Sequence, residues 1–131
     1  MEFISSKKTL DKNDFAVVTE KGNYIHELFT NFEHSPLAAK YSSQPFPGQY
    51  LLFLAGGLAE SSEVLPDDII ALSSLERVNF HRPGLIGDEI YLKATLIDEE
   101  IKNYQYKWEI FNHKDELLID CKVKFIRNVK K

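Results

Sequence analysis

The segment PFPGQYLLFLAGGLA, residues 45–59, places the strongest constraint on how this chain can fold. A helix is expected to begin at Pro47-Gly48, and apolar side chains occupy every side of it as far as Leu58. A helix that is apolar all round must be enclosed by other structure. Gly56 and Gly57 each destabilise such a helix by roughly 1 kcal/mol relative to alanine. We therefore expect another element to pack closely against the two glycines.

The two halves of the chain differ in periodicity. Up to about residue 65 the signals are helical: Asp11 is a candidate N-cap before a helix over 12–19, and Ser35-Pro36 marks another helix start. The second half alternates apolar and polar side chains, as antiparallel strands do. The predicted strands cover 67–80, 89–97, 103–111 and 117–125, and Gly87-Asp88 predicts a turn.

One apolar helix and several long strands have a simple packing solution. The sheet curls around the helix, so that both bury their apolar surfaces together. The expected fold is therefore α+β: a single hotdog domain over residues 1–131, with an antiparallel sheet wrapped around the central helix. Its edge strand stays exposed, and edge-to-edge pairing of two copies is a natural way to cover it. Five aromatic side chains either line a tunnel or fill the core, with core filling the default: Tyr50, Phe53, Tyr104, Tyr106 and Trp108.

Composition excludes several classes of function. The 131 residues carry a formal net charge of −4, which does not favour nucleic-acid binding. The N-terminus lacks the apolar stretch of a signal peptide, and the longest apolar run is too short to span a bilayer, so we expect a cytoplasmic protein with no membrane partner. Cys121 is the single cysteine and is expected to be a buried, unreactive thiol. His34, His81 and His113 lack metal-ligand spacing, so no metal site is predicted.

Three segments together resemble the MaoC-like family of hotdog hydratases and dehydratases. DFAVVTEKGNYIH (14–26) is similar to the family pattern F-A-x-L-[ST]-x-D-x-N-P-[IL]-H, and PGQYLL (47–52) stands where the family has H-G-M-L at the start of its central helix. VNFHRPGLIGDEIYLKATL (78–96) is similar to the family's F-x-x-P-V-x-x-G-D-x-[IL]. The matching positions in this third segment are Phe80, Pro83, Gly87, Asp88 and Ile90.

The resemblance implies a reaction on acyl thioesters. In such proteins an aspartate and a histidine five residues later hold one water molecule, and add it to or remove it from the double bond beside the thioester carbonyl. The backbone N–H at the start of the central helix, here that of Gly48, polarises the carbonyl oxygen. His26 is the expected catalytic histidine, and the expected substrate-binding residues are Lys21, Asn23 and Gln49. The substrate is carried on coenzyme A or on the phosphopantetheine of an acyl carrier protein, and no further cofactor is implied.

The catalytic pair is incomplete, because Lys21 stands five residues before His26, where the family has aspartate. A lysine cannot act as an anionic base. In the leading interpretation Glu20 takes the aspartate's role after a loop shift that Gly22 permits. The chain would then be an (R)-specific enoyl-thioester hydratase or 3-hydroxyacyl-thioester dehydratase, working as a homodimer.

Two other interpretations stay open. The chain is a catalytically silent subunit that forms a heterodimer with a second hotdog chain, or it binds or hydrolyses an acyl thioester by another route. His81 and Arg82 lie in the third similar segment, where family members vary, and we expect them at the surface or at the mouth of a tunnel.

Overall fold

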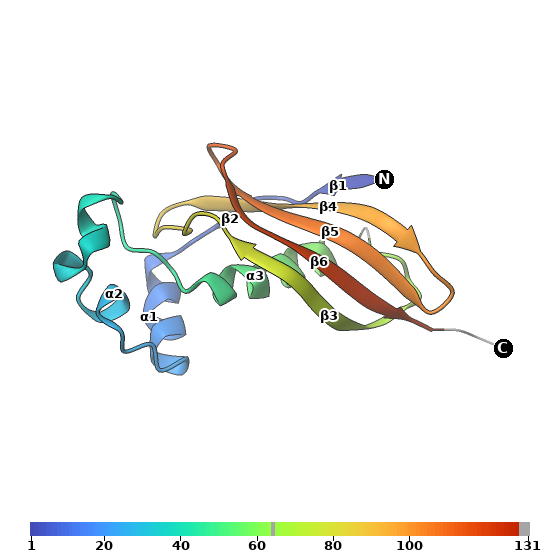
Figure 1. The fold of residues 1–131 in the computed structure, drawn as a ribbon, viewed down its shortest axis with the longest axis horizontal. Coiled ribbons are helices and arrows are strands. Elements are labelled where there is room, and N and C mark those ends of the chain that lie inside the picture. Colours follow the sequence, from blue (N-terminus) through green and yellow to red (C-terminus); the bar gives the residue numbers. More distant parts are fainter. Residues whose placement is uncertain (64, 129–131) are drawn as a thin grey trace.

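The computed structural model describes residues 1–63 and 65–128, which form one antiparallel sheet packed against a central helix (Figure 1). The strands are β1 (Glu2–Ile4), β2 (Lys8–Thr9), β3 (Ile69–Phe80), β4 (Glu89–Glu99), β5 (Asn103–Asn112) and β6 (Leu117–Arg127). Their order is β1-β4-β5-β6-β3, and β2 also pairs with β4. The helices are α1 (Lys12–Lys21), α2 (Glu27–Thr30) and α3 (Gly48–Ser61), with 3-10 helices η1 (Phe32–His34) and η2 (Pro36–Ala39).

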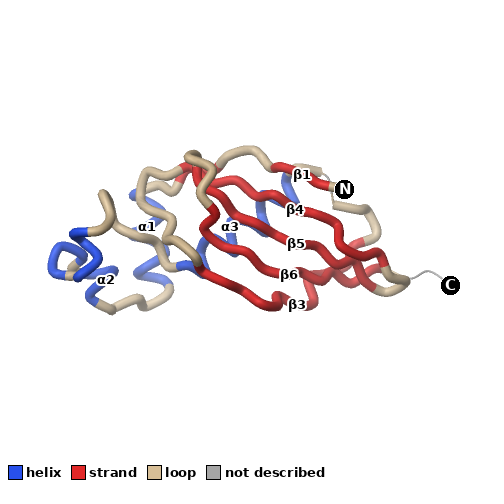
Figure 2. The backbone as a smooth tube through the Cα atoms, turned by 45° about the horizontal axis from the view of Figure 1, so that its top comes forward, coloured by secondary structure: helices blue, strands red, loops and turns tan. Residues whose placement is uncertain are grey.

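α3 lies along one face of the sheet, whereas α1 and α2 lie beyond one end of it (Figures 1 and 2). A single antiparallel sheet around one central helix is the α+β hotdog arrangement that the sequence predicts, and that prediction is confirmed. None of the helices in the described residues has the length and apolar character needed to cross a membrane.

The core lies between α3 and the inner face of the sheet. The buried side of α3 consists of Leu51, Ala55, Leu58 and Ala59. Alternate residues of β4, β5 and β6 are buried with it, as the two-residue period predicts: Ile90, Leu92, Ala94, Tyr104, Tyr106, Trp108, Ile110, Ile119, Cys121, Val123 and Phe125. Burial raises the pKa of the Cys121 thiol to about 11, so this cysteine stays protonated at neutral pH, as expected of an unreactive core thiol.

The opposite side of α3 is not covered, which corrects two expectations. Phe53 is 74% exposed, so the predicted enclosure of the helix on every side is wrong for the single chain. A Cβ added at Gly56 or Gly57 would have no heavy atom within 4 Å, so no element in the described residues packs closely against the glycines. The physical reason is that one sheet can cover only one side of a helix.

The helix starts were predicted from their caps. Asp11 accepts a hydrogen bond from the Asn13 N–H at 2.6 Å and caps α1, which runs to Lys21, slightly further than predicted. Ser35 caps a helix that begins at Pro36, although that helix is 3-10. The short strands β1 and β2 were not predicted, because two or three residues carry too little periodicity to identify a strand.

The predicted turn before β4 is present and ties two distant segments together. Gly87 has φ of +96°, a conformation that glycine adopts without strain. Its N–H donates to the Leu10 carbonyl at 2.8 Å, and the Leu10 N–H donates to the Asp88 carbonyl at 2.7 Å. The chain entering α1 is therefore anchored at the start of β4.

β3 forms one free edge of the sheet, since among the described residues it pairs only with β6. Its register with β6 shifts at several points, and Arg77 has φ of +52°, so the strand is irregular. Ile70, Leu72 and Phe80 are exposed apolar side chains on this strand. The exposed edge that the fold prediction requires is thus β3.

Replacing Leu51 with alanine tests how far stability depends on the buried side of α3. Leu51 is 1% exposed, so Leu51→Ala should lower the free energy of unfolding by about 2–5 kcal/mol, because it leaves a cavity between helix and sheet. Ile101 is 79% exposed, and Ile101→Ala should change the same quantity by less than about 0.5 kcal/mol. Urea unfolding of both variants gives the comparison, and equal losses would contradict this account of the core.

Candidate functional site

The N-terminus of α3 has free backbone donors. Pro47 occupies the N-cap position and has no side-chain acceptor to offer, while the Tyr50 N–H donates back to the Pro47 carbonyl at 3.1 Å. Among the described residues, no group accepts the N–H of Gly48 or of Gln49. Free N–H groups at a helix start carry partial positive charge and favour a negatively charged or strongly polarised oxygen.

Gly48 and Gln49 line a cleft with mostly apolar walls, here called the N-terminal cleft. It has a volume of about 420 Å³ and is lined by α2, η2, the start of α3 and the end of β3. The residues that matter below are Leu28, Phe29, Gly48, Gln49, Phe80, His81 and Arg82. An apolar cleft with a few polar donors at one end suits a ligand with an apolar body and a carbonyl group.

Gly48 is needed for the shape of this cleft. A Cβ added at Gly48 would lie 2.5 Å from Cε1 of Phe80, closer than side-chain carbons approach one another. The Phe80 ring, at the end of β3, therefore packs directly on the first residue of α3. This contact connects the helix start to the edge strand and fixes one wall of the cleft.

His26 lies outside the cleft walls, although it begins the helix that supplies two of them. It is the N-cap of α2, and its Nδ1 accepts a hydrogen bond from the Leu28 N–H at 3.0 Å. Leu28 and Phe29 line the cleft. Because Nδ1 accepts, the proton of the neutral ring resides on Nε2, and this exposed side chain can donate from Nε2.

The other residues of the predicted catalytic loop are not gathered at the cleft. Glu20 and Lys21 form the last turn of α1, and the Asn23 N–H donates to the Glu20 carbonyl at 3.2 Å. Gly22 has φ of −86°, so the loop does not use the conformational freedom of glycine. A Cβ added there would overlap the Tyr24 ring, so glycine serves a close contact instead. The loop shift proposed for Glu20 is absent from this conformation.

Lys21 lines a separate shallow hollow between α1 and α3. Its neighbours there are Asp14, Val17, Val18, Tyr50 and Phe53. The structure thus brings Gly48 and Gln49 together in the cleft, and leaves Lys21 on a different side of α3. Asn23 has φ of +56°, which asparagine tolerates better than most residues, and it shapes the turn between α1 and α2.

His81 and Arg82 lie at the cleft, where the sequence places them, and each has an acidic neighbour. His81 Nε2 is 3.3 Å from Asp120 Oδ2, and Arg82 is 3.1 Å from Glu116 Oε2. A hydrogen bond from Asn79, and a second from His81, lower the pKa of the Asp120 carboxyl. Sequence reasoning missed these acidic partners, because nothing in the strand pattern of β6 says which side chain faces His81.

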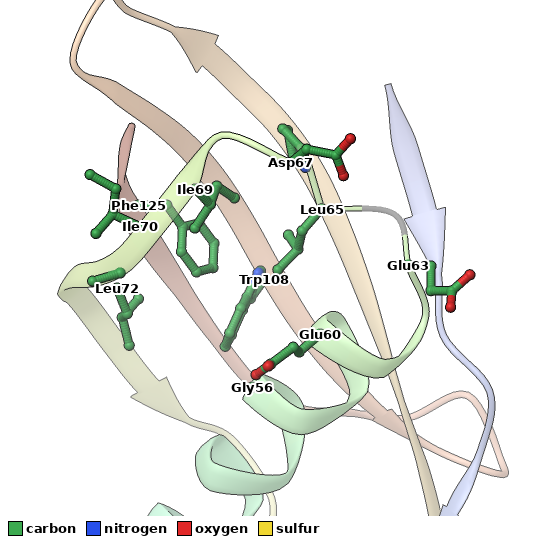
Figure 3. Close-up of a pocket in the computed structure, with 12 residues that line it drawn as sticks. Gly56, Glu60, Glu63, Leu65, Asp67, Ile69, Ile70, Leu72, Trp108 and Phe125 are labelled. Atoms are coloured by element: carbon green, nitrogen blue, oxygen red, sulfur yellow. The ribbon is translucent and has the colours of Figure 1, made fainter. Parts of the chain in front are cut away.

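A second cavity lies between the C-terminal half of α3 and the start of β3, and we call it the edge cavity. Its volume is about 810 Å³, and the Trp108 and Phe125 side chains lie in it between Gly56 and Glu60 of α3 and Ile69 of β3 (Figure 3). Trp108 Nε1 is buried and has no hydrogen-bond partner among the described residues. Trp108 therefore fills the core and borders a cavity as well.

Neither cavity contains a cluster that could bind a metal ion. Within residues 1–63 and 65–128 no three His, Cys, Asp or Glu side chains come together in a ligand geometry. The polar groups of the N-terminal cleft are instead backbone N–H donors, an amide and two basic side chains. Such groups can donate hydrogen bonds to oxygen atoms of a ligand.

No family model and no curated protein matches the chain. Solved structures match it over nearly its full length. An Archaeoglobus protein described as a monoamine oxidase regulatory protein matches with a TM-score of 0.83 and 19% identity, covering 100% of this chain and 90% of that one. The (R)-hydratase PhaJ1 of Pseudomonas aeruginosa matches with a TM-score of 0.74 and 12% identity, covering 99% and 81%.

The 3R-hydroxyacyl-ACP dehydratase complex HadBC of Mycobacterium tuberculosis is also similar, with a TM-score of 0.76, 15% identity and 95% of each chain covered. At these identities the likeness establishes the hotdog fold. The fold places the start of the central helix, the free donors of Gly48 and Gln49, and the N-terminal cleft in one region of the molecule.

The close contact between Gly48 and Phe80 can be tested with two glycine substitutions on the same helix. Gly48→Ala should lower the free energy of unfolding by about 1–3 kcal/mol, because the new methyl group overlaps the Phe80 ring. Gly57→Ala, where the added Cβ meets open space, should instead raise it by up to about 1 kcal/mol through helix propensity.

Phe80→Ala provides the internal control for this contact. In a double-mutant cycle measured by urea unfolding, Phe80→Ala should offset part of the Gly48→Ala loss, with a coupling of at least about 0.5 kcal/mol. Strict additivity of the two substitutions would show that the ring does not form this wall of the cleft.

Proposed function

We propose that this chain is a MaoC-like hydratase or dehydratase that interconverts enoyl and 3-hydroxyacyl thioesters. The observation that carries the proposal is that Gly48 and Gln49, whose N–H groups have no acceptor among the described residues, line a mostly apolar cleft. A thioester carbonyl bound there gains negative charge when a proton leaves the α-carbon or when water adds to the β-carbon. The similar structures include proteins named as an (R)-hydratase and a hydroxyacyl-ACP dehydratase, which supports the same class of reaction.

In the proposed hydration, the Gly48 N–H donates to the carbonyl oxygen while a water molecule attacks the β-carbon. Glu20 takes one proton from that water and passes it to the α-carbon, while the His26 Nε2–H donates a hydrogen bond that holds the water oxygen, so that one water is added across the double bond and both side chains end as they began. The Nδ1 contact to the Leu28 N–H keeps the His26 proton on Nε2, where this role needs it. For Glu20 to reach the same water, the last turn of α1 has to unwind.

The remaining expected residues bind the substrate in this proposal. Gln49 lies in the cleft wall and presents its amide beside the carbonyl site. Lys21 and Asn23 lie outside the cleft and contact the carrier, which is coenzyme A or the phosphopantetheine of an acyl carrier protein. Two copies pair through the exposed edge of β3, and the buried thiol of Cys121 suits a cytoplasmic protein.

A second candidate function is favoured by the geometry of the α1–α2 loop. Glu20, Lys21 and Asn23 all lie outside the cleft, and His26 is engaged as a helix cap. A catalytically silent subunit needs none of them at the substrate. Such a subunit would pair with a second hotdog chain that carries the missing aspartate. A thioesterase or a plain acyl-thioester-binding protein is a third and weaker candidate, because the central helix has no acid before Glu60.

An assay on the purified protein separates the candidates. With a short-chain enoyl-CoA, wild-type protein should remove the absorbance of the conjugated thioester, and His26→Ala should reduce that rate by at least about 10²-fold because the hydrogen-bond donor that holds the water is lost. His34→Ala, an exposed histidine of η1, is the matched control and should keep the wild-type rate. Glu20→Gln then tests the proposed base by the same measurement.

Absence of hydration on both CoA and carrier-protein substrates, by protein shown to be folded, would overturn the hydratase assignment. It would direct the search to a partner chain, identified by a stable complex that restores activity. Hydration that persists in His26→Ala would leave the reaction in place and remove His26 from its mechanism.

A further inference from the structure

α2 is too short to satisfy the backbone groups at its own ends, since it spans only Glu27–Thr30. At its N-terminus, the Leu28 N–H donates to Nδ1 of His26 at 3.0 Å. At its C-terminus, the carbonyls of Leu28 and Phe29 accept no backbone N–H from any described residue. These two carbonyls therefore depend on a donor from elsewhere in the chain.

The side chain of Gln44 supplies that donor. Its Nε2 lies 2.9 Å from the Phe29 carbonyl oxygen and 3.2 Å from the Leu28 carbonyl oxygen. An amide NH₂ group has two N–H donors, which is one for each carbonyl. Every other hydrogen bond that α2 makes within the described part of the chain stays between residues 25 and 31. The Gln44 amide is therefore the hydrogen-bonded link between α2 and a distant segment.

Gln44 belongs to the segment that fixes the start of the central helix. Its backbone carbonyl accepts the Ile86 N–H at 2.9 Å. Two residues further on, the Phe46 N–H donates to the Gly84 carbonyl at 2.9 Å, and the Phe46 side chain is buried. The chain then enters α3 at Gly48. A hydrogen bond from the Gln44 side chain thus ties α2 to the part of the fold that carries the carbonyl donors.

Leu28 connects the two side chains that bind the ends of α2. Its N–H donates to the His26 ring, and its carbonyl accepts from Gln44. Because the Leu28 N–H keeps the proton of the neutral His26 ring on Nε2, any displacement of Leu28 also changes the position and the tautomer of that ring. Leu28 and Gly48 line the same cleft. The distance between the histidine and the carbonyl site therefore depends on how α2 is held.

We infer that Gln44 is a positioning residue for His26 in the proposed hydration. The cleft is lined by its neighbours Pro45 and Phe46, whereas the Gln44 side chain reaches the carbonyls of α2. Gln44 thus acts through α2 and keeps the histidine that holds the water at a constant separation from Gly48. Its effect on the reaction rests on the proposed function, but the link itself is a property of the fold.

Removal of the amide tests the link without any substrate. Gln44→Met keeps nearly the same side-chain length and removes both donors. Hydrogen exchange of the Leu28 N–H, measured by NMR, should become at least about fivefold faster, because α2 loses both bonds to the rest of the fold. At a pH where the His26 ring is neutral, its nitrogen chemical shifts should move from those of the Nε2–H tautomer toward a mixture of the two tautomers.

Two further variants control this measurement. Gln44→Lys again places N–H donors near the last carbonyls of α2, and it should restore the exchange rate and the ring shifts to near their wild-type values. Gln105→Met makes the same chemical change on β5 and should leave both readouts at Leu28 and His26 unchanged.

The kinetic test uses the short-chain enoyl-CoA. Gln44→Met should lower kcat about tenfold and change KM by less than about threefold, because the His26 ring is displaced while Gly48 and Gln49 stay in place. In a His26→Ala background the same substitution should have no further effect on kcat, since the residue that it positions is absent. A merely structural role would lower kcat by the same factor in both backgrounds.

The outcomes separate the link from the reaction. Unchanged exchange at Leu28 in Gln44→Met overturns the inference, whether or not the chain is an enzyme. Faster exchange with an unchanged kcat, in a chain that hydrates the thioester, overturns the positioning role. A folded wild-type chain that hydrates neither CoA nor carrier-protein substrates overturns the proposed function and the positioning role with it. In that case faster exchange in Gln44→Met still supports the link between Gln44 and α2.

Discussion

Packing of one side of α3 against the inner face of the sheet is the interaction on which the other features depend. Leu51, Ala55 and Leu58 fix both the position of the helix and its rotation about its own axis. With that rotation set, the N-terminus of α3 must open into the cleft beside Phe80, and its C-terminal half must border the start of β3. The same rotation leaves Phe53 and the two glycines facing away from the sheet.

The proposed reaction assigns carbonyl activation and proton transfer to different parts of this structure. The donors of Gly48 and Gln49 belong to a helix held by the core, so their position follows from the fold. The segment around His26 is held by local contacts, such as the cap on Leu28 and the close packing of Gly22 on Tyr24. A locally held loop can change its side chains at little cost to the fold. Residues of this loop, Lys21 among them, can therefore vary while the cleft is kept.

Periodicity in the sequence was sufficient for the sheet, the central helix and the turn at Gly87, because each depends on local patterns. It also placed Gly48 and Gln49 at the start of α3, and His81 and Arg82 near the cleft. It did not predict that Gly56 has no close neighbour among the described residues, or that Glu20 lies outside the cleft. An apolar pattern tells which side chains avoid water, but it does not tell whether a residue's partner belongs to the same chain. Phe53 fits the apolar pattern of α3, yet its side chain is 74% exposed in the single chain.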